Sequence, residues 1–161
     1  MENIPHLRRY ARVLTRDNQQ TEDLVQDCLD RAWSRMSQWQ ADTNLRAWLF
    51  TIMHNLHVNT LRRNSRQVEW EYLDGKDLVD TRQTDQEGAM DLRDLEKALN
   101  RLSADQREVL ILVCVEGLSY AQVSEVLNVP TGTIMSRLHR AREEMRRWLH
   151  GDEIPKLRRV K

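Results

Sequence analysis

The sequence is poor in the residues that build turns, disulfides and membrane spans. It has 5 Gly, 3 Pro and 2 Cys in 161 residues, which argues against turn-rich sandwiches and barrels and against low-complexity chains. No apolar run approaches the roughly 18 residues of a membrane span, and the first residues do not resemble a secretory signal. We therefore expect a cytoplasmic protein without membrane insertion, in which Cys28 and Cys114 are buried free thiols.

The chain also lacks net charge, because 25 basic side chains balance 25 acidic ones. The balance is uneven along the chain. Residues 1–70 hold 10 basic and 8 acidic groups, residues 71–100 hold 4 and 9, and residues 101–161 hold 11 and 8. Arginine outnumbers lysine by 21 to 4, which suits phosphate and guanine contacts but also follows from genomic base composition. Neutrality therefore does not exclude a nucleic-acid partner.

Apolar residues recur at helical spacing in three segments of the first 66 residues. The segment 5–15 begins with Pro5, which suits a first helical turn, and a second segment, 21–38, has Thr21 as its expected cap. Its apolar face includes Leu29, Trp33 and Met36, and a third segment, 44–63, follows. Three such helices can bury their apolar faces against one another, so we predict a small helical domain over residues 1–66.

An acidic stretch without apolar periodicity separates this domain from a second one. Residues 67–88 are rich in Asp, Gln, Thr and Gly, which predicts a flexible acidic linker. Helical patterning returns over residues 89–150, followed by a basic tail at 151–161. The predicted fold is therefore all-α, with two small helical domains joined by a linker.

The second predicted domain contains a helix-turn-helix pattern. Ser103 with Gln106 and Ser119 with Gln122 form two expected capping boxes, and Gly117 is expected to end a helix. Asn128 suits the left-handed position of a tight turn, after which a final helix, capped by Thr131, begins. A short helix, a turn and an arginine-rich helix predict duplex DNA binding through the major groove.

The final helix has an outer face suited to DNA. With its apolar residues turned inward, its outer face carries Ser136, His139 and Arg140, and Arg140 is a natural bidentate partner for guanine. Arg137 and Arg142 lie on the flanks, within reach of phosphates. Thr131, Gly132 and Thr133 offer backbone N–H groups at the helix N-terminus. The alternative is a solvated helix face whose arginines form surface pairs with Glu143 and Glu144.

The first domain carries a polar group of its own. Asn55, Asn59 and Arg62 recur at helical spacing, and seven of nine aromatic residues lie in residues 1–72. Amides, guanidinium groups and aromatic rings are what a single strand with unstacked bases requires, but an ordinary solvated face fits equally well. His54 and His57 lack matching ligands, so we predict no metal site. The sequence shows no nucleophile–base motif or Gly-rich phosphate loop, so we predict no enzyme activity, small-molecule substrate or cofactor.

Two sets of motifs resemble bacterial sigma factors. The segments EDLVQD at 22–27, RAW at 31–33 and NLRAWLFTI at 44–52 look like the second conserved region. The segments LSADQREVL at 102–110, EGLSY at 116–120 and GTIMSRLHRAR at 132–142 look like the fourth. Because only these two regions are present, joined by a linker, the layout resembles the extracytoplasmic-function sigma factors.

The resemblance implies a promoter-specificity subunit that works on RNA polymerase and is usually controlled by an anti-sigma factor. It implies that the first domain docks on the polymerase clamp and captures the melted −10 element, and that the second domain engages the flap and reads the −35 duplex. The implied core-binding residues are Asp23, Gln26, Asp27 and Asp30. The implied −10 residues are Asn55, Asn59, Arg62, Arg63 and Arg66, together with the loop before Asn44. The linker would thread the polymerase cleft.

Two rival functions share this pattern. One is a free-standing helix-turn-helix regulator with a helical sensing domain, although no heptad repeat for dimerisation is evident. The other is an interaction module, such as a decoy for a regulator of sigma factors. Transcription that depends on core polymerase separates a promoter-specificity subunit from both rivals.

Overall fold

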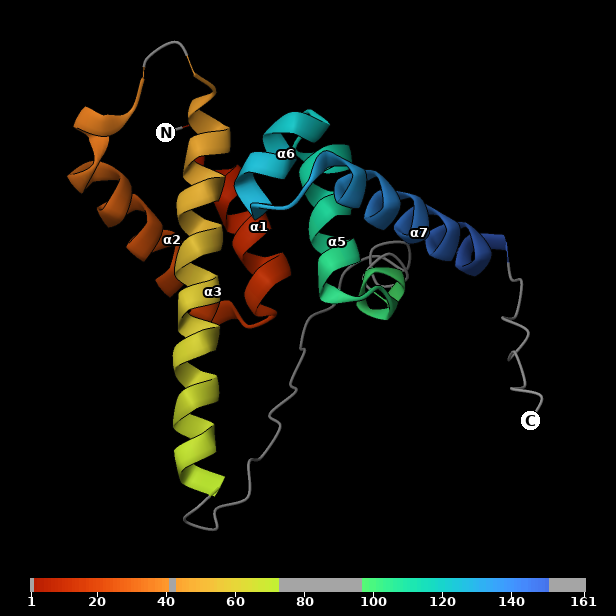
Figure 1. The fold of residues 1–161 in the computed structure, drawn as a ribbon, viewed down its shortest axis with the longest axis horizontal. Coiled ribbons are helices and arrows are strands. Elements are labelled where there is room, and N and C mark those ends of the chain that lie inside the picture. The colour runs from red at the N-terminus through yellow and green to blue at the C-terminus, as the bar shows by residue number, and fades with distance from the viewer. Residues whose placement is uncertain (1, 41–42, 73–96, 151–161) are drawn as a thin grey trace.

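The protein is helical throughout the residues that its structure describes (Figure 1). The structure is a computed structural model that describes residues 2–40, 43–72 and 97–150, with the side chains of 66–72 and 149–150 left out. No strand occurs in these ranges. The predicted all-α fold is therefore confirmed.

Three long helices form the N-terminal half. They are α1 (Ile4–Thr15), α2 (Asn18–Ser34) and α3 (Leu45–Tyr72), with a short 3₁₀ helix, η1 (Met36–Gln38), after α2. The expected cap at Thr21 is wrong, because Asp17 caps α2 through a bond from the Gln20 N–H at 2.8 Å. Thr21 is buried inside the helix, where its hydroxyl donates to the Asp17 carbonyl.

The third helix is longer than its apolar pattern predicts. Asn44 starts α3 by accepting hydrogen bonds from the N–H groups of Arg46 and Ala47. The helix then continues to Tyr72, past residue 66, where we place the end of the first domain. Residues 73–88 of the predicted linker and the tail at 151–161 lie outside the described residues.

The C-terminal half begins with a short helical stretch, residues 97–101. It continues with α5 (Ala104–Leu110), a π-helical turn η2 (Ile111–Val115), α6 (Tyr120–Leu127) and α7 (Thr131–His150). Both capping boxes are confirmed, at Ser103 and at Ser119. Gly117 follows η2 with a left-handed φ of 69°, a conformation that glycine adopts without steric cost.

The helix-turn-helix forms as predicted between α6 and α7. Asn128 ends α6 in the left-handed conformation, with φ 52°. Ser124 supports the turn by donating its hydroxyl to the Val129 carbonyl at 2.6 Å. Thr131 is not the cap but the first residue of α7. The carbonyl of Pro130 accepts the first bonds of the helix, from Thr133 and Ile134.

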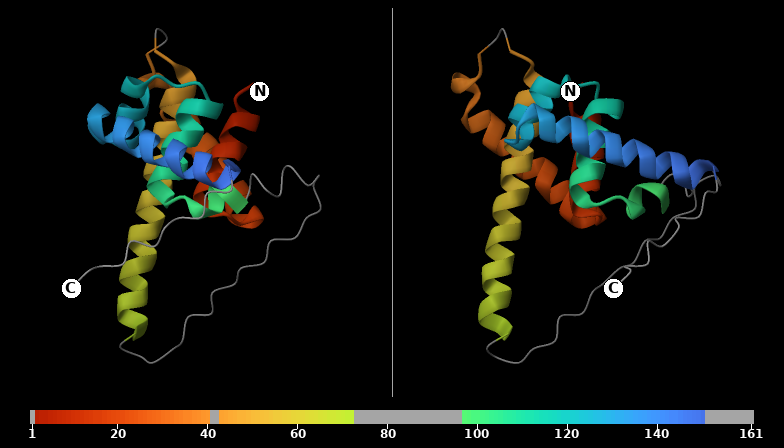
Figure 2. Two further views of the ribbon diagram at one scale, coloured as in Figure 1. Left: turned by 90° about the vertical axis from the view of Figure 1, so that its right-hand side faces the viewer. Right: turned by 45° about the vertical axis from the view of Figure 1, so that its right-hand side comes forward.

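The two halves pack directly against each other. Helix α3 contacts α6, and α1 contacts both α5 and η2 (Figure 2). One continuous cluster of buried apolar residues runs through both halves, from Leu7 to Leu138. The packing brings α6, the first helix of the helix-turn-helix, onto the helix that carries the predicted −10 residues.

Candidate nucleic-acid and protein interfaces

The outer face of α7 is open to a ligand. Ser136, His139 and Arg140 are exposed, while Ile134, Leu138 and Ala141 are fully or almost fully buried, as the helical wheel predicts. Within the described part of the chain, Arg140 makes no hydrogen bond or ion pair. Its five N–H donors are therefore available to a base edge.

The two flanking arginines of α7 are held by the protein itself. Arg137 forms an ion pair with Asp105 at 2.7 Å, and its side chain is one-quarter exposed. Arg142 donates to the sulfur of Cys114 at 3.6 Å, an interaction that raises the pKa of Arg142. Each contact uses a single terminal nitrogen, Nη2, so the remaining N–H donors of both arginines can still reach a phosphate.

The N-terminus of α7 leaves room for a close approach. Gly132 is exposed, and a Cβ added there would meet nothing within 4 Å. Thr131 and Thr133 beside it are half-buried. The N–H groups of Thr131 and Gly132, which unlike that of Thr133 have no acceptor among the described residues, favour an anion together with the helix dipole, so the geometry is compatible with a DNA phosphate.

The polar face of α3 is likewise exposed. The side chains of Asn55, Asn59, Arg62 and Arg63 all face solvent, and Arg66 lies on the same helix with its side chain outside the described residues. Within the described residues, none of the first four side chains has a hydrogen-bonding or ionic partner. The helix that carries them projects beyond the rest of the molecule (Figure 1), so a strand can reach this face.

The two histidines of α3 are used inside the protein. His54 lies 2.8 Å from a carboxylate oxygen of Glu108, across the contact between the halves. His57 is half-buried, and this burial lowers its pKa, which favours the neutral ring at pH 7. Among the described residues, no group of three or more His, Cys, Asp or Glu side chains is arranged to hold a metal ion.

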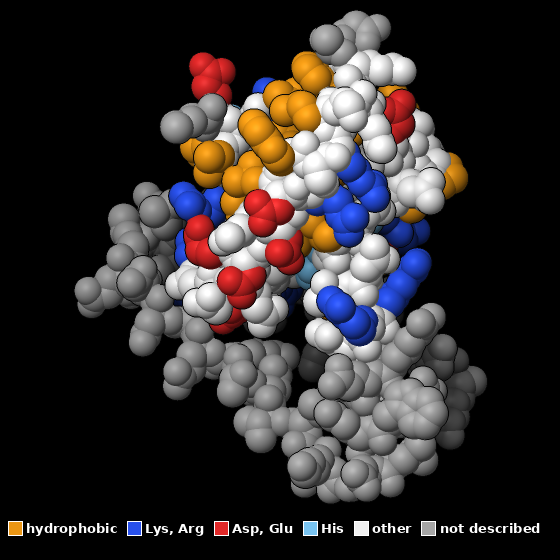
Figure 3. Space-filling view, turned by 90° about the vertical axis from the view of Figure 1, so that its left-hand side faces the viewer, with side chains coloured by type: hydrophobic (Ala, Val, Ile, Leu, Met, Phe, Trp, Pro, Cys, Tyr) orange, Lys and Arg blue, Asp and Glu red, His pale blue; other side chains and the backbone are white. Residues whose placement is uncertain are grey.

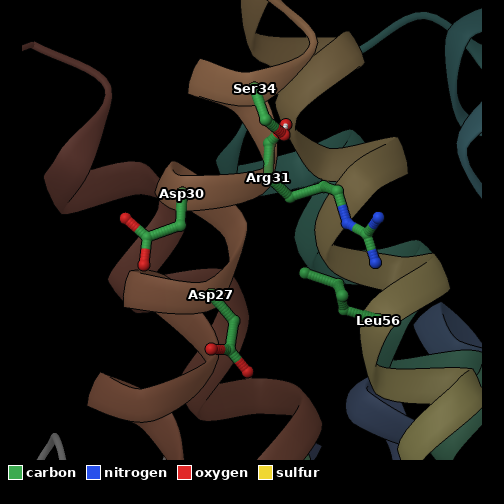
Figure 4. Close-up of a pocket in the computed structure, with 5 residues that line it drawn as sticks. All are labelled: Asp27, Asp30, Arg31, Ser34 and Leu56. Carbon is green, nitrogen blue, oxygen red and sulfur yellow. Dashed lines mark hydrogen bonds between the residues drawn. The ribbon is translucent and has the colours of Figure 1, made fainter.

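The acidic residues predicted to bind core polymerase lie together on the outer surface of α2. Asp23, Gln26, Asp27 and Asp30 are all exposed. Asp27 and Asp30 border a shallow pocket between α2 and α3, where the Arg31 guanidinium extends towards Leu56 (Figure 4). This surface offers carboxylates and one guanidinium to a partner.

An apolar patch on α2 was not expected to be exposed. We predicted that Leu29, Trp33 and Met36 belong to the buried face, but they are 36%, 82% and 47% exposed. Helices α1 and α3 cover only the stripe that contains Leu24, Cys28 and Ala32, because the apolar face of α2 is wider than the contact. Apolar and acidic side chains lie side by side on this face of the molecule (Figure 3), a combination typical of a protein-binding surface.

The contact between the two halves contains charged residues that sequence reasoning missed. Glu108 and Glu116 are buried, at 8% and 3% exposed, and their partners come from α1 and α3. Burial, reinforced by the nearby Glu108 carboxylate, raises the pKa of Tyr10 well above its usual range, so its hydroxyl remains a hydrogen-bond donor. The sequence signal that could have indicated their burial is that each glutamate stands next to apolar residues of its own segment.

The two cysteines occupy different environments. Cys28 is buried and donates its S–H to the Leu49 carbonyl, and burial raises its pKa to about 12. Cys114 is exposed, so the expectation of two buried thiols is wrong for this residue. It lies in the π-helical turn η2, where Ile111 and Leu112 are the buried residues.

Comparisons with known proteins agree with the two-part organisation. Residues 1–54 match the family described as the sigma2 domain of PhyR, and residues 92–145 match Sigma-70, region 4. The ECF RNA polymerase sigma factor EcfG of Rhodopseudomonas palustris is 37% identical over 150 residues, which cover 92% of this chain and 82% of that protein. This chain belongs to the ECF sigma factors of RNA polymerase. The resemblance carried by the sequence motifs is thereby confirmed.

A further relative and two solved structures are similar to this ECF sigma factor over most of its length. SigL of Mycobacterium tuberculosis is 36% identical over 159 residues, covering 90% of this chain and 83% of that protein. The sigma factor RpoE of Bartonella quintana, solved with the anti-sigma factor NepR, is 38% identical, with a TM-score of 0.76 over 94% of each chain. PhyRSL of Sphingomonas sp. Fr1 has a TM-score of 0.70 at 21% identity, which shows a shared fold.

Family membership fixes the broad role of the chain. ECF sigma factors are DNA-binding transcription initiation factors, as the match to region 4 also indicates. Residues of the helix-turn-helix and of α3 are therefore to be interpreted as parts of an initiation factor. Among the described helices, none is both long enough and apolar enough to span a membrane.

Proposed function

We propose that this ECF sigma factor directs RNA polymerase to promoters by dividing recognition between α7 and α3. The observation that carries the proposal is that each helix has exposed side chains without a partner among the described residues, namely Arg140 on α7 and Asn55, Asn59, Arg62 and Arg63 on α3. These helices belong to the two halves of a chain whose similarity to ECF sigma factors covers 92% of its length. Each half then has a DNA surface of its own.

Duplex reading at the −35 element is assigned to α7. Arg140 supplies a bidentate donor to a guanine edge, with Ser136 and His139 beside it on the exposed face. Phosphate contacts come from Thr131, Gly132 and Thr133 at the helix N-terminus and from the flanking Arg137 and Arg142. In the described structure Asp105 and Cys114 each contact one terminal nitrogen of these two flanking arginines, which leaves their other N–H donors for phosphates.

Capture of the melted −10 strand is assigned to α3. Asn55, Asn59, Arg62, Arg63 and Arg66 follow one another along one side of the helix, where amides can read unpaired base edges and guanidinium groups can pair with phosphates. Melting costs stacking and pairing energy, and capture of the displaced strand offsets that cost. The loop before Asn44 completes the expected site.

Docking on core polymerase is assigned to the outer face of α2. The carboxylates of Asp23, Asp27 and Asp30, with Gln26, attract a basic partner, while the exposed Trp33 beside them supplies apolar area. Exposed tryptophan is typical of the residues that dominate binding energy in protein interfaces. In this proposal the clamp of the polymerase covers α2, and the flap contacts the C-terminal half.

Control by an anti-sigma factor follows from the structural relatives. The RpoE relative is solved with the anti-sigma factor NepR, and PhyRSL is also solved in complex with NepR. We propose that a comparable partner binds this chain and competes with the polymerase. The apolar patch of Leu29, Trp33 and Met36 is a suitable surface for such competition, because one partner can cover it at a time.

A decoy function deserves a direct comparison, since the family model for residues 1–54 is named after PhyR. A structure of PhyR with NepR is described as that of an anti-anti-sigma factor. The 38% identity to the sigma factor RpoE, against 21% to PhyRSL, favours the initiation factor. The exposed Arg140 also favours it, because a decoy has no use for a base-reading side chain.

Transcription with purified components tests the proposal. Start sites mapped after overexpression supply candidate promoters, which are then transcribed in run-off reactions with core polymerase. Initiation at these promoters that requires both core and this chain is the expected result. A chain that binds an anti-sigma factor yet never supports initiation would identify a decoy, and tight promoter binding without core would identify a free-standing regulator.

A further inference from the structure

Within residues 131–142 of α7, all of which the structure describes, one large apolar side chain is exposed. It is that of Met135, which is 50% exposed. The other aliphatic side chains of this stretch, those of Ile134, Leu138 and Ala141, are fully or almost fully buried. Single exposed apolar residues are common on protein surfaces. The place of Met135 on the helix and the chemistry of its neighbours therefore decide whether it has a role.

Met135 borders the face of α7 that is proposed to read duplex DNA. At 3.6 residues per turn it lies about 40° from His139 and about 60° from Gly132 around the helix axis, with one of them a turn before it and the other a turn after it. His139 is exposed, and Gly132 has open space where a side chain would stand. The surface on both sides of Met135 is therefore open to an approaching DNA groove.

Met135 differs chemically from the exposed residues around it. The other exposed side chains of this stretch all carry hydrogen-bonding groups, namely those of Ser136, His139, Arg140 and Arg142. Residues 131–142 include three arginines and no acidic residue, so the surroundings of Met135 attract a polyanion such as DNA. An apolar side chain within such a surface gains binding energy only from an apolar group of the same ligand.

The major groove of DNA offers one apolar group of this kind, the C5 methyl group of thymine. The other three bases present hydrogen-bond donors and acceptors there. The recognition helix of a helix-turn-helix contacts base edges through its N-terminal residues, and Met135 is the fifth residue of α7. Its unbranched side chain, with three rotatable bonds, can adjust to the position of a methyl group.

We infer that Met135 selects a thymine of the −35 element by burying its C5 methyl group. The inference rests on the proposed function, in which Arg140 of the same helix reads a guanine edge. Met135 precedes Arg140 by five residues, a rise of about 7.5 Å along α7, and stacked base pairs are about 3.4 Å apart. The thymine should therefore lie about two base pairs from that guanine. The two side chains then specify different base pairs of one element.

Replacement of thymine by deoxyuridine tests the contact directly, because it removes one methyl group and retains base pairing. The full chain is saturated with core polymerase, and its affinity for promoter duplexes is measured at constant salt concentration. Each thymine of the mapped −35 element, on either strand, is replaced in turn. We expect one thymine whose replacement weakens binding by about three- to fivefold, the effect of burying one methyl-sized group.

Met135→Gln shows whether this preference belongs to Met135. Glutamine is similar in length and helix propensity but polar, so this change at an exposed position should leave the fold intact, which circular dichroism checks. The variant should bind the thymine and uracil duplexes equally. Arg147→Gln, at another exposed position of α7, is the matched control. It should retain the preference of the unaltered chain for thymine, whatever its affinity for the duplexes as a group.

The outcomes separate the methyl contact from the proposed function. Equal binding of thymine and uracil duplexes by the unaltered chain, at every −35 position, would overturn the inference. A preference that persists in folded Met135→Gln would also overturn it. In both cases, continued dependence of binding on a −35 guanine would leave the proposed function intact. Binding by the core-bound chain that is independent of the −35 sequence would refute the proposed function and the methyl contact together.

Discussion

Arg140 is the residue on which promoter discrimination is expected to depend most. It is exposed and without a partner among the described residues, whereas Arg137 and Arg142 are held by Asp105 and Cys114. The helical wheel predicted its direction, because a regular helix with a buried stripe fixes the opposite face. The partners of the other two arginines could not be predicted, since they depend on how α5 and η2 pack on α7.

Replacing Arg140 by Ala should cost about 1–3 kcal/mol of discrimination at one base pair of the −35 element, if it reads a guanine edge. The measurement is run-off transcription, or binding by the polymerase-bound chain, on promoters that vary at each −35 position. Arg147→Ala changes an exposed residue farther along α7. It should reduce transcription from all promoter variants by the same factor or leave it unchanged. Unchanged discrimination in Arg140→Ala would remove the proposed role.

The two thiols should differ strongly in reactivity. The thiolate is the reactive form, and burial raises the Cys28 pKa to about 12, so this thiol stays protonated and inaccessible near pH 8. Ellman's reagent should therefore titrate one thiol per folded chain rapidly and two after unfolding. Cys114→Ser should abolish the rapid reaction, and rapid reaction of two thiols in the folded chain would contradict the packing of α2.

The element boundaries that sequence predicted best are those set by local chemistry. The capping boxes at Ser103 and Ser119 and the left-handed Asn128 involve residues within four positions of one another, so they form wherever the chain is helical. The start of α2 was misplaced because Thr21 and Asp17 are both good capping residues. The choice between them depends on the turn that joins α1 to α2.

Ser119→Ala should lower the free energy of unfolding by about 1 kcal/mol, because it removes the hydroxyl that accepts from the Gln122 N–H at 3.2 Å. Chemical denaturation monitored by circular dichroism measures the change. Ser37→Ala, at an exposed position in η1, should have an effect within about 0.5 kcal/mol. Equal stability of Ser119→Ala and the unaltered chain would indicate that the second capping box contributes nothing.

The exposed face of α2 shows that helical periodicity alone does not predict which apolar residues are buried. Its apolar stripe predicts burial for Trp33 as much as for Ala32, although only Ala32 is covered within this chain. A stripe wider than its contact identifies a surface that needs a partner. Which residues remain uncovered could be decided only from the arrangement of the neighbouring helices.

Reversing one charge on this face tests its role. Asp27→Arg should weaken binding to core polymerase by about tenfold or more, since it places a cation where the proposal expects a basic partner. Fluorescence anisotropy of the labelled chain with core polymerase measures the affinity. Glu2→Arg changes another exposed acid, near the N-terminus, and should leave the affinity unchanged. Normal core affinity of a folded Asp27→Arg variant would exclude this face as the docking surface.

At the scale of the whole molecule, the two helical units were predictable and their mutual packing was not. Periodicity reports which face of each helix is buried, but says nothing of which helix covers it. Glu116 illustrates the limit, because its partners His6, Arg9 and Arg46 lie 70 to 110 positions away in the sequence. The contact between α3 and α6 likewise emerges only from the three-dimensional structure.

The most direct test of the account is a footprint of the polymerase-bound chain on a mapped promoter, read at both elements of one complex. We expect permanganate reactivity of unpaired thymines at the −10 element together with nuclease protection of the −35 duplex. The Asn55→Ala/Asn59→Ala variant should lose mainly the −10 opening, and Arg140→Ala mainly the −35 protection. Loss of both signals in both variants, or of neither in either variant, would contradict the division of promoter recognition between α3 and α7.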